Sequence, residues 1–170
     1  GAAWFTDKAN DQIGRITPAG VVERFSDPSI SGPTLIDGAP DGPAWFLNAT
    51  TQTLGHITAA GAVTDHVPPL GEIAQPIDLA VSPTGSVWMA NTGNPGGSLV
   101  RFDPALGFDL SYFPSNPSRI AAAPDGSVWV VDGLARNGLA HISSDMAVIG
   151  GAAVTGDAIA DVEVAADGAA

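Results

Sequence analysis

Four oxygen-bearing side chains recur at nearly equal spacing and have the clearest capacity for chemistry. Each stands three residues after a tryptophan: Asp7, Asn48, Asn91 and Asp132. Carboxylate and amide oxygens are ligands that Mg²⁺ and Ca²⁺ prefer, and they also bind hydroxyl groups. We predict that these residues bind a polar ligand, and that Asp7 and Asp132 hold a metal ion. The alternative is that they cap strand ends and bind loop amides, as Asn and Asp do in turns.

The elements that must position these side chains are short strands in a repeat. The tryptophans stand at positions 4, 45, 88 and 129, at separations of 41, 43 and 41 residues. This period is typical of propeller blades. No segment has helical periodicity, and turn residues bound each apolar run. We predict an all-β chain: a β-propeller of four four-stranded blades in one domain, residues 1–170, with repeats at about 1–41, 42–84, 85–125 and 126–167.

Each predicted blade begins with an inner strand of small apolar residues. These strands are expected at residues 35–39, 77–81, 119–123 and 159–165. An Asp-Gly or Thr-Gly pair follows each of the first three, which favours a two-residue hairpin turn into the tryptophan strand. The loop entering the inner strand and the loop leaving the tryptophan strand then share one face. The four oxygen-bearing residues should therefore surround one mouth of the central channel, on what we term the upper face.

The two ends of the sequence complement each other. Residues 1–25 supply three outer strands, and residues 159–165 supply one inner strand. Pairing them would close a four-bladed ring and remove exposed edges. The alternative is a segment of a longer propeller, such as part of a seven-bladed one. We favour the segment, because the chain starts without Met and within a repeat.

Composition excludes several partners. Six Lys plus Arg against eighteen Asp plus Glu give a net charge of -12, which repels nucleic acid and anionic membranes. Because the chain has no cysteine, it has no disulfide, thiolate metal site or Cys nucleophile. No run of 18 apolar residues and no leader is visible. A small polar ligand or a protein at the upper face is the expected partner, and the compartment is not indicated.

Three phrases placed in register carry a resemblance to a known family. They are Trp4-Phe5-Thr6-Asp7, Ile13-Gly14-Arg15-Ile16-Thr17-Pro18-Ala19-Gly20 and Pro40-Asp41-Gly42. The sequence resembles the virginiamycin B lyase (streptogramin lyase) family over its whole length. The resemblance implies a seven-bladed propeller and a carbon-oxygen lyase. Such an enzyme uses bound Mg²⁺ and a His with nearby Glu residues to open cyclic streptogramins by elimination.

The resemblance also places the catalytic His, in a Gly-Pro-His-Gly-Ile phrase fourteen residues before the acidic residue of Trp-Phe-Thr-Glu. The corresponding positions here hold Thr34, Ile77, Ser118 and, by alignment, Ala158. The position two residues earlier, where the family can carry a metal-binding Glu, holds Gly32, Gln75, Asn116 and Gly156. None of these residues is a base. Two functions therefore stay open: a Mg²⁺-dependent lyase in intact form, or a non-catalytic propeller that binds a polar small molecule or protein.

The three histidines favour structural roles. His56 and His141 share a repeat position with Arg15 and Arg101, which indicates a recurring cationic position rather than a catalytic one. His66 is expected to be exposed on an outer strand. The serines lie mostly in turns without a catalytic signature, so the sequence suggests no Ser-His-Asp arrangement.

Overall fold

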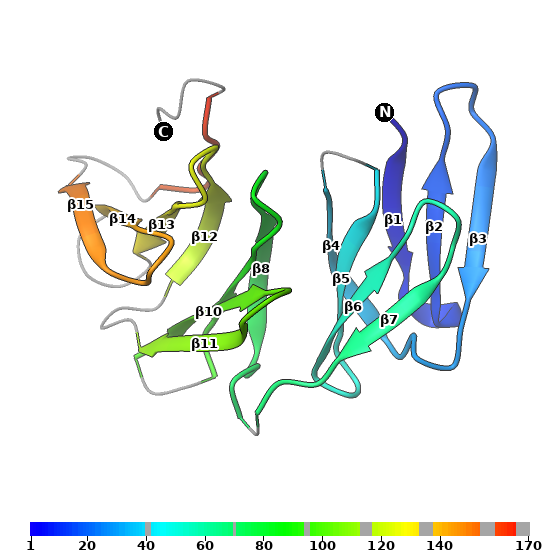
Figure 1. Ribbon diagram of the computed structural model, residues 1–170, viewed down its shortest axis with the longest axis horizontal. Helices are drawn as coiled ribbons and strands as arrows, with labels where there is room; N and C mark the ends of the chain where they lie inside the picture. The colour runs from blue at the N-terminus through cyan, green and yellow to red at the C-terminus, as the bar shows by residue number, and fades with distance from the viewer. Residues whose placement is uncertain are drawn as a thin grey trace. The chain divides into compact units, whose positions relative to one another are not determined.

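The computed structural model describes residues 1–39, 42–69, 71–93, 96–112, 117–132, 138–153 and 159–165, with backbone alone at 110–112 and 132. It forms two compact units, Gly1–Gly71 and Glu72–Ala170 (Figure 1). Each unit holds two of the four sheets, and the single domain over residues 1–170 stays a prediction. The only described helix is the three-residue η1, Lys8–Asn10, and no described helix is long and apolar enough to cross a membrane.

The first unit contains two antiparallel sheets of sequential strands. One has three strands: β1 (Ala3–Asp7), β2 (Gln12–Ile16) and β3 (Val22–Ser26). The other has four: β4 (Pro33–Gly38), β5 (Ala44–Asn48), β6 (Thr53–Ile57) and β7 (Val63–His66). The predicted order, with the inner strand next to the tryptophan strand, is confirmed in the four-stranded sheet.

The second unit contains two further four-stranded antiparallel sheets. The first is formed by β8 (Pro76–Val81), β9 (Val87–Asn91), β10 (Ser98–Asp103) and β11 (Gly107–Tyr112). The second is formed by β12 (Pro117–Ala122), β13 (Val128–Asp132), β14 (Gly138–Ile142) and β15 (Val148–Ala153). The all-β prediction and the four repeated sheets are confirmed, and ring closure stays a prediction.

Two local expectations were wrong. Residues 159–165 form no strand. A strand needs a hydrogen-bonded neighbour, and none of the described residues pairs with this segment. The loops after the inner strands are also longer than a two-residue hairpin. Between β8 and β9 the amide of Ser82 binds the carbonyl of Ser86, and Gly85 has a φ of 94°. Gly85 therefore has the positive φ expected of a turn glycine, but it lies in a five-residue loop rather than in a two-residue hairpin turn.

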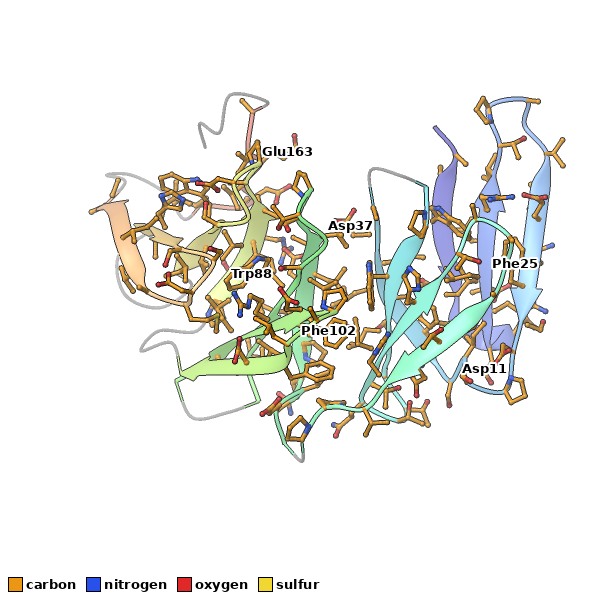
Figure 2. All side chains as sticks on the ribbon, viewed as in Figure 1. Asp11, Phe25, Asp37, Trp88, Phe102 and Glu163 are labelled. Atoms are coloured by element: carbon orange, nitrogen blue, oxygen red, sulfur yellow. The ribbon has the colours of Figure 1, made fainter. Side chains whose placement is uncertain are left out.

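Both sheets of the first unit repeat a contact between the tryptophan strand and its outer neighbour. Gly14 stands opposite Phe5, and Gly55 stands opposite Phe46. A Cβ added to Gly55 would lie 2.2 Å from the Phe46 ring, so the aromatic ring covers the glycine backbone. In the second unit, fully buried Trp88 joins a cluster with residues of both sheets (Figure 2).

The recurring cationic position has the predicted structural role. It stands opposite the tryptophan in every repeat, in the pairs Trp4 with Arg15, Trp45 with His56, Trp88 with Arg101 and Trp129 with His141. The Arg15 guanidinium lies 5.2 Å from the Trp4 ring, and the His56 ring lies 4.5 Å from Trp45. These contacts hold the two central strands of each blade together.

Candidate functional site

The inner strands begin with an irregularity that repeats in three sheets. In each, a proline pairs with the oxygen-bearing residue that ends the tryptophan strand: Pro33 with Asn48, Pro76 with Asn91, and Pro117 with Asp132. The register shifts directly after each proline. Bulges re-aim side chains and are frequent beside active sites. This repeated bulge is the part of the fold best suited to present a functional side chain.

The residues at the bulges are those at the position where the resemblance places a catalytic His. Thr34 donates a long hydrogen bond of 3.5 Å from Oγ1 to the Leu47 carbonyl, and Ser118 donates from Oγ to the Val131 carbonyl at 3.4 Å. Ile77 packs against the core of the second unit. These side chains bind their own sheet or its core. The fourth residue, Ala158, lies outside the described residues.

The positions two residues earlier also serve the local backbone. The Gly32 amide donates to Asp11 Oδ1 at 2.6 Å, and Gln75 has a φ of 48°. The carbonyl of Gln75 accepts hydrogen bonds from both the amide and the hydroxyl of Thr92 at 3.2 Å. Asn116 and Gly156 lie outside the described residues. Sequence reasoning missed Asp11, whose turn position shows no repeated motif.

In the first unit, Asn48 ties the loop before the inner strand to the tryptophan strand. Its side chain is fully buried, and its Oδ1 accepts from the Ser31 amide at 2.9 Å. Its Nδ2 donates to the Ser29 carbonyl at 2.8 Å and to Thr53 and Asp65 oxygens at 3.2 Å. Both polar atoms are thus used within the protein, as the strand-capping alternative expects. The ligand role of Asn48 stays a prediction.

In the second unit, Asn91 occupies the repeat position of Asn48, but its Oδ1 lacks the hydrogen bond that Asn48 Oδ1 accepts. It is also fully buried, and its Nδ2 donates to the Glu72 carbonyl at 2.8 Å and to Ser98 Oγ at 3.3 Å. Its Oδ1 accepts no hydrogen bond from any described residue. A buried amide oxygen without a donor is costly. Asn91 is therefore the only one of the four predicted ligand residues, among those with described side chains, that has a buried unused oxygen.

The side chain of Glu72 also has an unused oxygen. Its main chain receives the Asn91 bond, while its Oε2 is shielded from solvent and has no partner among the described residues. Burial raises the pKa of the Glu72 carboxyl, and the negative charge of Asp109 raises it further. A cation or a hydrogen-bond donor would relieve both effects. Sequence reasoning missed Glu72, because the acid belongs to no repeated position.

Of the two residues predicted to hold a metal, Asp7 has a described side chain and Asp132 does not. Both carboxylate oxygens of Asp7 accept from Asn10 Nδ2, at 3.0 and 2.9 Å. The side chain of Asp132 lies outside the described residues. In the described part of the chain, no group of three or more His, Cys, Asp or Glu side chains could hold a metal. The metal role of Asp7 and Asp132 stays a prediction.

A serine and a histidine that the sequence did not bring together do meet in the second unit. Ser127 Oγ lies 2.7 Å from His141 Nε2 and 2.5 Å from Asp125 Oδ1. The carboxylate can only accept, so the serine proton points to Asp125 and the histidine donates from Nε2. A nucleophilic serine needs the reverse, with the histidine as acceptor. The arrangement therefore closes a turn, and the His141 ring stacks on Trp129 at 4.2 Å.

The prediction for His66 was wrong in one respect. Its side chain is half-buried, because its ring lies 5.3 Å from the Trp45 ring. Burial lowers the pKa of His66, while the charge of Asp65 acts in the opposite direction. His66 and His56 thus both contact one tryptophan, which supports a packing role for each.

Comparison with known families and structures gives a consistent result. The model of the virginiamycin B lyase family matches residues 1–159. Virginiamycin B lyase from Staphylococcus aureus is similar in structure, with a TM-score of 0.71 and 24% identity over 92% of this chain and 53% of that one. The chain thus spans about half the length of that lyase. No curated protein sequence gives a significant match.

Two other solved structures share the fold. A catalytically inactive variant of the S. aureus lyase, solved with quinupristin, has a TM-score of 0.72 at 23% identity and covers 92% of this chain and 53% of that chain. A gluconolactonase from Xanthomonas campestris has a TM-score of 0.71 at 14% identity and covers 98% of this chain and 64% of that chain. At these identities the likeness shows the fold alone.

Proposed function

We propose a function from one premise: the chain belongs to the virginiamycin B lyase family. Within that family, the described blades of this chain bind a ligand rather than catalyse its conversion. They bind a polar ligand or a hard cation at the edge where the inner strands begin, and their bulged residues abstract no proton. The expected partner is a small polar molecule.

One observation carries this proposal: the chemistry of the three bulges. Elimination needs a general base whose pKa lies near the working pH, most often a His or a carboxylate. Thr34 and Ser118 carry hydroxyls that bind main-chain carbonyls, and Ile77 carries no polar atom. The three bulges are present, and the residues in them lack a side chain that can accept the proton in an elimination.

The unused oxygens of the second unit support binding. Asn91 Oδ1 and Glu72 Oε2 are shielded acceptors, and the hydrogen bond between Asn91 Nδ2 and the Glu72 carbonyl joins the two residues. Ligand groups that donate hydrogen bonds would satisfy these acceptors. The chain's net charge of -12 favours neutral or cationic ligands over anionic ones.

Asn91 and Glu72 have the oxygen chemistry that suits the Mg²⁺ implied by the family resemblance. Amide and carboxylate oxygens suit this ion, which keeps several waters when few protein ligands are present. Asn91 and Glu72 would hold it in the second unit, and the metal role of Asp7 and Asp132 is a separate prediction. When bound, the ion supplies a Lewis acid that polarises an oxygen of the ligand. The protein's own contribution is to hold Asn91 in place through its bonds to Glu72 and Ser98.

A streptogramin lyase is the second candidate function. It is favoured by the family match and by the bulge, which recurs at the position that the resemblance assigns to the catalytic His. In this version the base comes from outside the described bulges. The described blades then contribute to ligand binding within a larger catalytic propeller.

Calorimetric titration and a ring-opening assay test the proposal together. Mg²⁺ and Ca²⁺ should bind the full chain, and Glu72→Gln and Asn91→Ala should each weaken that binding at least tenfold. Glu163→Gln, which alters an exposed carboxylate of the same unit, is the matched control. Quinupristin incubated with the chain and Mg²⁺ should stay cyclic by reversed-phase chromatography. Ring opening would support the second candidate, and cation binding that is equal in all variants would contradict the first.

A further inference from the structure

Strand β15 differs from the other outer strands in having no charged side chain. The outer strands β3, β7 and β11 carry Glu23 with Arg24, Asp65 with His66, and Asp109. Strand β15 reads Val-Ile-Gly-Gly-Ala-Ala. Charges on edge strands prevent pairing with other chains, and a strand without them offers its free amides and carbonyls as a template.

This strand is also open on both faces. All six residues are exposed, with Val148 at 70% and Ile149 at 57%. Among the described strands it is the last of its sheet, and β14 is its one described partner. A strand of apolar residues exposed in this way is the form that β-strand addition uses.

The packing of β15 requires a glycine at one of its two glycine positions and not at the other. A Cβ on Gly151 would lie 2.7 Å from the Leu139 carbonyl oxygen, so the packing of β14 requires a glycine there. A Cβ on Gly150 would meet only the His141 Cβ at 3.8 Å, which is ordinary contact. The fold therefore does not require glycine at 150. A glycine within a strand often marks a place where another backbone approaches closely.

We propose that β15 pairs with β15 of a second copy of this chain, antiparallel and about a two-fold axis between Gly150 and Gly151. In this register Val148 stands opposite Ala153, and Ile149 opposite Ala152, so each large side chain meets a small one. The two glycines meet at the axis. A symmetric contact of this kind is self-complementary.

Charge explains why the partner is a second β15. Each copy carries a net charge of -12, so two copies repel each other over most of their surfaces. Strand β15 is the outer strand, of the four described, where no charge has to be desolvated or brought next to a like charge. An uncharged edge therefore selects an equally uncharged partner strand, and β15 itself has that composition.

Sedimentation velocity over a range of concentrations tests the pairing with the full chain. The wild type should form a reversible dimer. Ile149→Lys and Ala152→Glu should each reduce dimerisation at least tenfold, because each places a charge opposite an apolar residue. An equimolar mixture of the two variants should dimerise again, since the introduced ammonium group of one copy then faces the introduced carboxylate of the other.

The control variant is Val22→Lys on the outer strand β3, where Val22 is 51% exposed. It should leave the dimer unchanged, and circular dichroism should show the wild-type spectrum for every variant. A wild type that stays monomeric at all concentrations would overturn the proposal. So would a dimer that persists in both charged variants, loss of the dimer in Val22→Lys, or a mixture that stays monomeric.

Discussion

The carboxylate of Asp78 binds the main-chain amide of Ile120 at 2.9 Å, and so joins the inner strands of two neighbouring sheets in the second unit. Its other oxygen accepts from the Leu79 amide at 3.0 Å. Burial raises the pKa of Asp78, while the two amides and Arg119 act in the opposite direction and Asp161 adds to the rise. This contact was not predictable from the repeats, because the equivalent positions hold Leu35 and Arg119.

Replacing Asp78 by Ala should lower the free energy of unfolding of the second unit by about 1–3 kcal/mol, since two amides lose their acceptor. Because its pKa is raised in the folded state, the Asp78 carboxyl favours the fold most below its ordinary value of 3.8, and this contribution declines as pH rises. Asp78→Asn should remove that part of the pH dependence. Urea unfolding followed by tryptophan fluorescence, at several pH values, measures both effects. A pH dependence of stability identical in Asp78→Asn and wild type would contradict this assignment.

The two buried asparagines should respond differently to truncation. Asn48→Ala leaves the Ser31 amide and the Ser29 carbonyl without their partner. Asn91→Ala removes the bonds to the Glu72 carbonyl and Ser98 Oγ, together with an oxygen that had no donor. We expect Asn48→Ala to cost about 1–3 kcal/mol more than Asn91→Ala. Urea unfolding of the two variants provides the comparison. Equal losses would show that the unused oxygen has no energetic cost.

The glycine under Phe46 should tolerate no side chain. A Cβ at Gly55 would lie 2.2 Å from the fully buried ring, so Gly55→Ala should destabilise the first unit by about 1–3 kcal/mol. The double variant Gly55→Ala, Phe46→Leu should recover part of the loss beyond additivity. Gly38→Ala is the control, because its nearest atom would be 3.7 Å away. Thermal unfolding measures all three, and a destabilised control would show that the effect is not specific to the ring contact.

The direction of the bond between Ser127 and His141 can be observed by NMR. We expect His141 to carry its proton on Nε2 when neutral, because Ser127 Oγ donates to Asp125. Nitrogen chemical shifts of the imidazole report the tautomer, and Ser127→Ala should shift them. A fluorophosphonate probe should leave Ser127 unlabelled in the intact protein. Labelling at this residue would contradict the structural role.

The repeat in the sequence is sufficient to predict most of the fold. Strand positions follow from local residue types: turn residues interrupt apolar runs, and tryptophan returns at a nearly constant interval. The shared position of Arg15 and His141 followed from the same repeat, and the structure showed that these residues pair with Trp4 and Trp129. The missing strand at residues 159–165 and the longer loop at Ser82 to Ser86 depended on pairing partners, which no local pattern supplies.

By itself, the sequence determined the repeated strands, the recurrence of their cationic and tryptophan positions, and the absence of a His at the four aligned catalytic positions. Only the tertiary structure separated Asn48 from Asn91, two identical residues at one repeat position. Their difference lies in whether a loop amide reaches Oδ1, and that depends on the path of a distant segment. The same holds for Glu72 and Asp78, because burial is the largest cause of the raised pKa of each carboxyl, and burial depends on packing against other parts of the chain.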